Sequence, residues 1–180
     1  MKPNDEIRNL ISELRSMDGA HRERARKMLV ELGTQATKAL LELLSDRDEH
    51  VRWEACKILG AIRDPIAAAP LAASLRDENI EVQWLATEAL IALGPEALVP
   101  LLQNLELHFD SIFVRQGAFH VLHDIERDYG LNEKTLALMN ALHAQDPVIT
   151  VAWAAHEALE SLRAHVSRTL GVYQGPLTET

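Results

Sequence analysis

The chain has 180 residues, of which 47% are hydrophobic, 25% charged and 4% aromatic, and this length suffices for one domain with a core. Its formal net charge of −9 argues against binding to nucleic acid, because such binding needs an excess of Lys and Arg. A single cysteine, Cys56, excludes an intrachain disulfide and a cysteine-rich zinc site. The polar start of the chain and the lack of a stretch of roughly 20 apolar residues predict a cytoplasmic protein without a membrane contact.

The chain contains five copies of one pattern. An alanine marks each copy, and a leucine follows it after four residues and a Leu or Ile after seven, which is the spacing of one helical face. The steps from one alanine to the next lie between 30 and 37 residues, a period typical of stacked repeats. The marker alanines are Ala25, Ala55, Ala86, Ala118 and Ala155.

A second amphipathic segment precedes each of these helices, so each copy is predicted to be a helical hairpin and no sheet is expected. In chain order, the hairpins are expected at 4–33, 34–63, 64–94, 95–130 and 131–165. Asp, Asn and Ser residues at the turns can cap the helices that follow them. Pro70 and Pro100 fall inside the first helix of their units, where we expect a bend.

The fourth copy and the end of the chain depart from the pattern. In the fourth, the turn is longer and the second helix is expected to continue to Arg127 and Tyr129 before Gly130. Such insertions can carry partner contacts, which makes Phe109 and Phe113 secondary candidates. Residues 166–180 lose the periodicity and are predicted to be extended or disordered.

One segment carries a family resemblance. The stretch from Val51 to Ile62, followed by Asp64 and Pro65, resembles the HEAT-repeat family, in particular the short bilin-lyase-like repeats. A turn aspartate, a Val-Arg pair and a Leu-Gly exit recur in register over residues 5 to 165. The resemblance implies an all-α fold, a right-handed α-solenoid of about five helical hairpins, in which the second helices line a concave surface. It also implies a scaffold that binds another protein or peptide.

The three tryptophans all lie two residues before a marker alanine or its equivalent. They would either fill the joints between hairpins or form a ladder that clamps an apolar or helical segment of a partner. When the core positions of the second helices are set aside, the remaining positions form a predicted partner-binding groove with aromatic, polar and charged side chains. Its residues are Trp53, Trp84, Trp153, Gln116, Glu23, Cys56, Lys57, Thr87, Glu88, Phe119, His120 and His156.

Three arginines directly follow the valine position or its equivalent: Arg22, Arg52 and Arg115. We predict a structural role for them. The guanidinium group suits contacts with backbone carbonyls or with the turn aspartate of a neighbouring repeat.

No catalytic residue, cofactor or metal is predicted. His120 and His123 share a helix face, but spacing fixes no third metal ligand, with His156 or Glu88 as the candidates. Deoxyhypusine hydroxylases of this family carry His-Glu pairs that hold two irons, and no histidine occupies those slots here. A HEAT-like DNA glycosylase, which Trp84 with Glu88 partly resembles, conflicts with the net charge.

We therefore predict a non-enzymatic adaptor that binds a partner segment in the groove, with self-association open. The alternative is a lyase or chaperone for a tetrapyrrole such as bilin or haem. That alternative rests on the resemblance of the repeats alone, since a half-buried cysteine such as Cys56 is usually an inert small hydrophobic residue.

Overall fold

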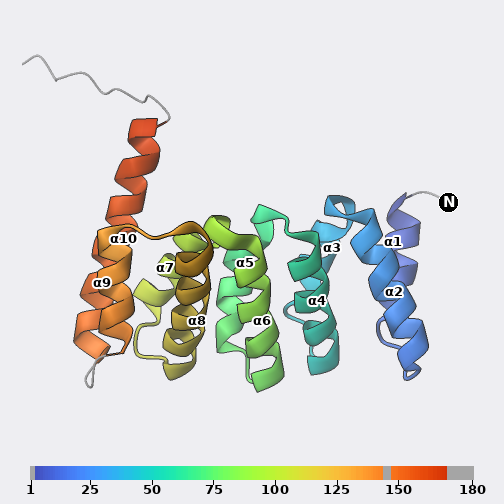
Figure 1. The fold of residues 1–180 in the computed structure, drawn as a ribbon. Helices are drawn as coiled ribbons and strands as arrows, with labels where there is room; N and C mark the ends of the chain where they lie inside the picture. Colours follow the sequence, from blue (N-terminus) through green and yellow to red (C-terminus); the bar gives the residue numbers. More distant parts are fainter. Residues whose placement is uncertain (1–2, 144–146, 170–180) are drawn as a thin grey trace, which may run out of the picture.

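The computed structural model describes residues 3–143 and 147–169, and every regular element within these ranges is a helix (Figure 1). The predicted all-α fold is thus confirmed. The helices are α1 (Pro3–Glu13), α2 (Gly19–Leu32), α3 (Thr34–Leu43), α4 (Glu49–Ile62), η1 (Pro65–Ala67), α5 (Ala68–Ala73), η2 (Ser74–Arg76), α6 (Ile80–Leu93), η3 (Gly94–Ala97), α7 (Leu98–Leu107), α8 (Ile112–Tyr129), α9 (Glu133–Leu142) and α10 (Pro147–Thr169).

The first four hairpins stack so that their helices form two rows. The first-helix row consists of α1, α3, α5 and α7, and the second-helix row consists of α2, α4, α6 and α8 (Figure 1). In the second-helix row, α4 packs against both α2 and α6, and α6 packs against α8. A hairpin cannot bury its own apolar stripe alone, so stacking creates the core.

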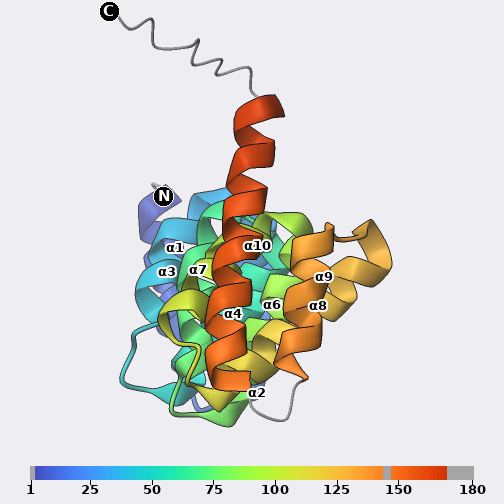
Figure 2. The same cartoon turned by 90° about the vertical axis from the view of Figure 1, so that its left-hand side faces the viewer.

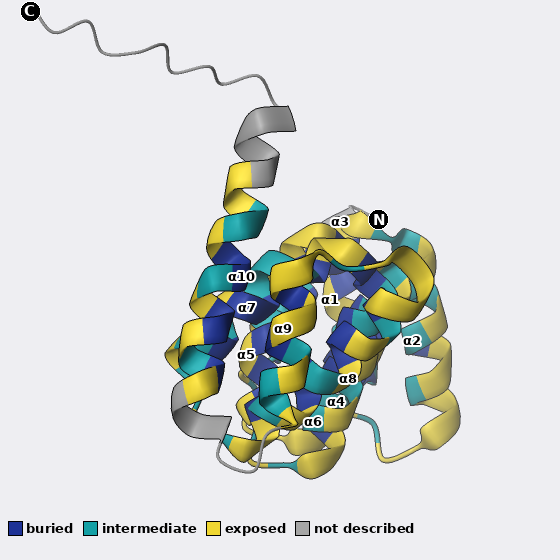
Figure 3. Cartoon of the chain, turned by 60° about the vertical axis from the view of Figure 1, so that its left-hand side comes forward, coloured by how far each residue is buried: buried dark blue, intermediate teal, exposed yellow. Residues whose placement is uncertain are grey.

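The repeated apolar positions form that core. All five marker alanines and the leucines four residues after them have no exposed surface. Figure 3 shows the buried positions on the sides of the helices that face their neighbours. Each second helix of the first four hairpins begins after a residue whose side chain accepts a backbone N–H, as predicted from the turn residues. These N-caps are Asp18, Asp48, Asn79 and Ser111.

The fifth hairpin exchanges the two rows. Here α9 packs against α8, and α10 packs against α7 and α9 (Figure 2). The linking glycines differ in the same place: Gly33 and Gly94 have ψ angles of −137° and −139°, whereas Gly130 has 157°. The first helix of the last hairpin thus continues the second-helix row. The ψ angle alone does not set the row, because Arg63 ends α4 with a ψ of 35° and the third hairpin keeps the order of the first two.

The prolines act differently from the prediction. Pro70 and Pro100 are each the third residue of an α-helix, α5 and α7, where a backbone N–H has no partner within the helix. Before each proline the chain forms a 3₁₀ turn, η1 or η3. The winding therefore changes from 3₁₀ to α just before each proline.

The helix α10 continues to Thr169 and extends past the ends of its neighbours (Figure 1). The prediction that residues 166–180 are extended or disordered is therefore wrong for 166–169. The remaining part of that prediction lies outside the described residues.

One stretch, Ile80–Leu107, is long and apolar enough to cross a membrane by length and composition alone. It comprises α6, η3 and α7, and the chain reverses within it at Gly94, which has a φ of 66°. Of its most apolar window, 56% is buried inside the protein. Packing in the core accounts for this composition.

The predicted structural arginines are confirmed at the edge of the stack where the hairpins turn. In four successive second helices, a side chain donates a hydrogen bond to the carbonyl oxygen six residues earlier. The pairs are Arg22 with Ser16 at 2.7 Å, Arg52 with Asp46 at 2.8 Å, Gln83 with Asp77 at 2.5 Å and Arg115 with Phe109 at 2.7 Å.

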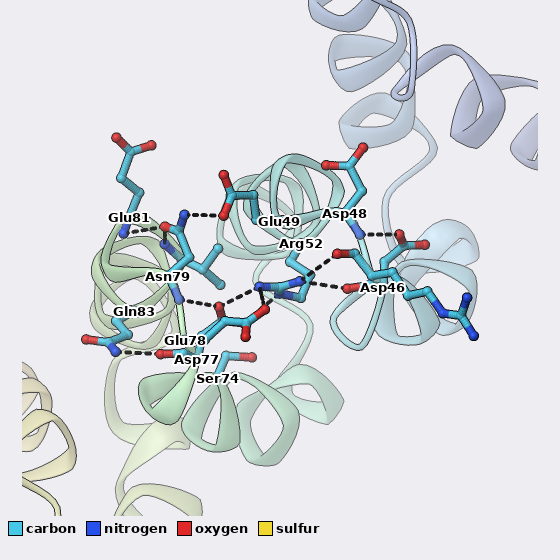
Figure 4. Close-up of polar contacts among 12 residues, drawn as sticks. Asp46, Asp48, Glu49, Arg52, Ser74, Asp77, Glu78, Asn79, Glu81 and Gln83 are labelled. Atoms are coloured by element: carbon cyan, nitrogen blue, oxygen red, sulfur yellow. Dashed lines mark hydrogen bonds and ion pairs between the residues drawn. The ribbon is translucent and has the colours of Figure 1, made fainter.

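Arg52 also joins the second hairpin to the third (Figure 4). Its Nε lies 2.7 Å from Oδ2 of Asp77 and its Nη2 lies 2.9 Å from Oδ1, a two-point contact between side chains that are 7% and 8% exposed. Arg15 pairs in the same way with Asp46 across the first junction, but its side chain is 45% exposed.

Burial should decide how much these two pairs contribute. Arg52→Ala leaves the Asp77 carboxylate buried without its partner and should lower the free energy of unfolding by about 3–5 kcal/mol. Arg15→Ala, the exposed counterpart, should lower it by less than about 1 kcal/mol. Urea unfolding of both variants measures the difference, and equal losses would contradict the assignment.

The helices α4 and α6 approach each other closely at Gly60. A Cβ atom there would lie 2.9 Å from both Cα and Cβ of Ala89, so Gly60→Ala must push the two helices apart. We expect this change to lower the free energy of unfolding by about 1–3 kcal/mol.

The control for Gly60→Ala is Gly19→Ala in α2, where the nearest atom to a new Cβ is Nη2 of Arg22 at 3.7 Å. It should leave stability unchanged or raise it by up to about 1 kcal/mol. Thermal unfolding of the pair is the measurement, and a stable Gly60→Ala variant would refute the close contact.

Candidate functional site

A pocket of about 290 Å³ lies on the second-helix row between α6 and α8, and we call it the α6–α8 pocket. Large apolar side chains surround it although they are exposed to solvent: Ile80 (71%), Trp84 (59%) and Phe113 (48%). Its remaining lining residues are Leu75, Gln83, Thr87, Gln116, Gly117 and His120.

A missing side chain shapes the floor of this pocket. A Cβ atom on Gly117 would lie 2.8 Å from Cδ2 of Leu75 and 3.2 Å from Oγ1 of Thr87. Glycine therefore lets α8 approach η2 and α6. The Thr87 hydroxyl is satisfied within its own helix, since it donates to the carbonyl oxygen of Gln83 at 3.0 Å.

A second pocket of about 280 Å³ adjoins the first on the other side of α8, and we call it the α8–α9 pocket. Gln116 and His120 line both pockets. Phe119 lies in the second one and meets the His143 ring edge-on, with 4.1 Å between the ring centroids. The two pockets with exposed Ile112 (53%) form a continuous apolar surface over α6, α8 and α9.

Trp53 has a different environment from Trp84 although both occupy the same repeat position. It is half-buried, and His50 stacks on it with ring centroids 5.7 Å apart and planes 6° apart. The Lys57 ammonium lies 4.5 Å from the ring centroid, and the Arg26 guanidinium lies 5.9 Å from it. Trp53 is thus a packed, cation-flanked ring, and Trp84 is an open one.

Trp153 and His156 were predicted to share the groove, and the structure places them elsewhere. Both lie on α10, which packs against α7 and α9 because of the row exchange. Trp153 is 66% exposed, and its ring centroid lies 6.0 Å from the Lys134 ammonium. Nδ1 of His156 lies 2.7 Å from Oε1 of Glu106 on α7, and this hydrogen bond raises the pKa of His156.

The other predicted groove residues divide by exposure. Cys56 is fully buried and does not present its side chain to a partner as predicted, whereas Thr87 is buried but lines the α6–α8 pocket. In α2, α4, α6 and α8, the exposed residues are Glu23, Lys57, Trp84, Glu88, Gln116 and His120, the half-buried ones are Trp53 and Phe119, and the buried ones are Cys56 and Thr87.

Within the described ranges, no group of three His, Cys, Asp or Glu side chains could hold a metal ion. His120 and His123 flank Phe119 instead, each with its ring centroid 6.0 Å from that of the phenyl ring. Glu54, which follows Trp53, is only 2% exposed and accepts a hydrogen bond from Arg26 at 2.9 Å. Its carboxylate joins α2 to α4.

Sequence reasoning missed Ile80 and Ile112 as members of the apolar surface. Each is the first residue of a second helix, directly after the capping residue. The same position holds Gly19 in α2 and Glu49 in α4. An apolar residue at an exposed helix start in two successive repeats is the signal that could have identified them.

Cys56 should be chemically inert in the folded protein. Burial raises the pKa of its thiol to about 12, so the reactive thiolate is scarce at pH 8. Ellman's reagent should therefore react slowly with the native chain and at once after unfolding in guanidinium chloride. Equal rates in the two states would show that the thiol is open to solvent.

Comparison with known proteins agrees with this architecture. The family described as HEAT repeats matches residues 7–91 and 68–160. No curated protein matches the chain. Because the two overlapping family matches run through the stacked hairpins and span well over half of the sequence, the chain belongs to the HEAT-repeat family.

Proposed function

We propose that this protein is a non-enzymatic adaptor that binds a peptide or helical segment of a partner protein at the α6–α8 pocket. HEAT repeats generally mediate protein–protein interaction as scaffolds. The proposal adds the location of the binding surface to that general role.

The observation that carries the proposal is the exposure of Trp84 beside Phe113 across one pocket. An exposed cluster of large apolar side chains is favourable only when something covers it, and such clusters mark interaction sites. Tryptophan is also enriched among the residues that dominate binding energy. Trp84 makes the better anchor because Trp53 is already covered by His50 and Lys57.

The size of the pockets favours side chains as occupants. Sites for small ligands usually enclose about 300–1,000 Å³. The α6–α8 and α8–α9 pockets hold about 290 Å³ and 280 Å³ and lie next to each other on an open surface. Two adjoining shallow pockets suit successive large side chains of a bound segment.

No observation favours the tetrapyrrole alternative. The alternative rests on the resemblance of the repeats alone, and Cys56 offers no reactive group in the groove because its thiol is fully buried. At about 290 Å³ and 280 Å³, each pocket lies at the lower end of the range for sites that enclose a small ligand.

The test compares two exposed tryptophans. Trp84→Ala should weaken partner binding by roughly 2–4 kcal/mol. Because Trp84 is 59% exposed, the same change should alter the free energy of unfolding by only about 0.5 kcal/mol. Trp153→Ala is the matched control, since Trp153 is 66% exposed but lies on α10 outside the pocket.

A partner captured from the native lysate by the wild-type protein should also be retained by Trp153→Ala and lost by Trp84→Ala. Calorimetry with the purified partner then gives the affinities, and thermal unfolding gives the stabilities. Equal binding by the wild type and Trp84→Ala would refute the site. A large loss of stability in Trp84→Ala would show that the ring has a packing role.

A further inference from the structure

The second-helix row changes its chemistry along its length. At one end, α2 carries four basic residues and two acidic ones, and α4 has two of each. Further along, α6 carries Glu81 and Glu88 and no basic residue. The apolar surface described above begins at α6. In a chain with a net charge of −9, the excess of positive charge in α2 contrasts with the acidic α6.

Two of these basic side chains, Arg26 and Lys57, flank the Trp53 ring. Two carboxylates lie among them, and both are already paired: Glu54 with Arg26 at 2.9 Å, and Glu23 with Lys27 at 2.7 Å. The hydrogen bond from Lys27, together with the charges of Arg26 and Lys57, lowers the pKa of Glu23. The surroundings of Trp53 therefore favour a negative charge.

Lys57 is the cation left without a carboxylate. It is exposed and contacts the Trp53 ring, and among the described residues no carboxylate oxygen lies within the 4.0 Å of an ion pair. The Lys57 ammonium is exposed and already positioned over the half-buried indole. Its side chain therefore loses little conformational entropy when a carboxylate of a partner pairs with it. A basic segment would be repelled at the same place.

The repeat fixes how far this charge lies from the apolar surface. Trp53 and Trp84 occupy equivalent positions on α4 and α6, which pack directly against each other. Neighbouring helix axes lie about 8–10 Å apart, so the α6–α8 pocket lies on the order of 15 Å from α4. An extended chain covers this distance in about four to six residues at roughly 3.3 Å per residue.

We propose that the bound segment is an acidic–apolar peptide, with an Asp or Glu over Lys57 and Trp53 and large apolar side chains in the α6–α8 pocket. About four to six residues separate the two ends. This inference rests on the proposed function and specifies its partner. Charge complementarity at α4 orients the segment along the row, while the apolar residues at α6 and α8 anchor it.

Selection from a displayed library of random peptides tests the proposal without knowledge of the natural partner. The library is bound to the wild-type protein and depleted on the Trp84→Ala variant. The enriched peptides should combine a large apolar residue with an Asp or Glu at the separation given above. One enriched peptide, labelled with fluorescein, then reports affinities by fluorescence anisotropy.

Three variants separate charge from packing. Lys57→Glu should weaken the labelled peptide by roughly five- to tenfold. Lys57→Met keeps an aliphatic cover on Trp53, and it should weaken binding by about two- to fivefold and reduce its salt dependence. Lys38→Glu makes the same charge change on an exposed residue of α3, in the first-helix row, and should leave the affinity unchanged.

Each further outcome counts against a defined claim. Trp84-dependent enrichment of neutral or basic peptides would overturn the acidic–apolar segment and leave the proposed function intact. An absence of Trp84-dependent enrichment would overturn both. Light scattering tests whether a second copy of the chain occupies the pocket instead. A wild-type protein that is dimeric and becomes monomeric on the change Trp84→Ala would show this, and it would overturn the acidic–apolar segment.

Discussion

The close contact between α4 and α6 at Gly60 and Ala89 is the constraint on which the rest of the structure depends. Small residues at this point let the two helices approach until their backbones meet, and Gly117 plays the same part between α8 and its neighbours. The distance between neighbouring helices determines which side chains can be buried between them. It buries Cys56 and Thr87, and it leaves Trp84 and His120 on the ridges above them.

Features that repeat with the chain could be predicted from the sequence. The marker alanines, the capping residues and the carbonyl contacts of Arg52 and Arg115 each depend on a few neighbouring residues, and these recur in register. Two kinds of feature could not be predicted in this way. Whether a position such as that of Cys56 is open depends on how near the next helix comes, and the place of Trp153 depends on the row that α10 joins after the linker at residues 130–132.

The stack separates the task of holding the repeats together from the task of presenting a surface. Buried polar contacts such as that of Arg52 with Asp77 lie at the edge formed by the hairpin turns. The apolar pockets lie on the helix faces of the second-helix row. Because the two sets of residues are separate, the face with the pockets can vary in sequence while the junctions stay the same, a division that suits a family with many partners.

The exchange of the two rows at the fifth hairpin ends the regular stacking of the repeats. Within residues 34–130, each hairpin adds its first helix to one row and its second helix to the other. An inserted or deleted copy there would therefore lengthen or shorten the array without changing the order of the rows. After α8 this modularity is lost, because α9 occupies the place where another second helix would dock and runs in the opposite sense. Growth by duplication is thereby confined to the interior, and the face that begins at α2 ends at α9.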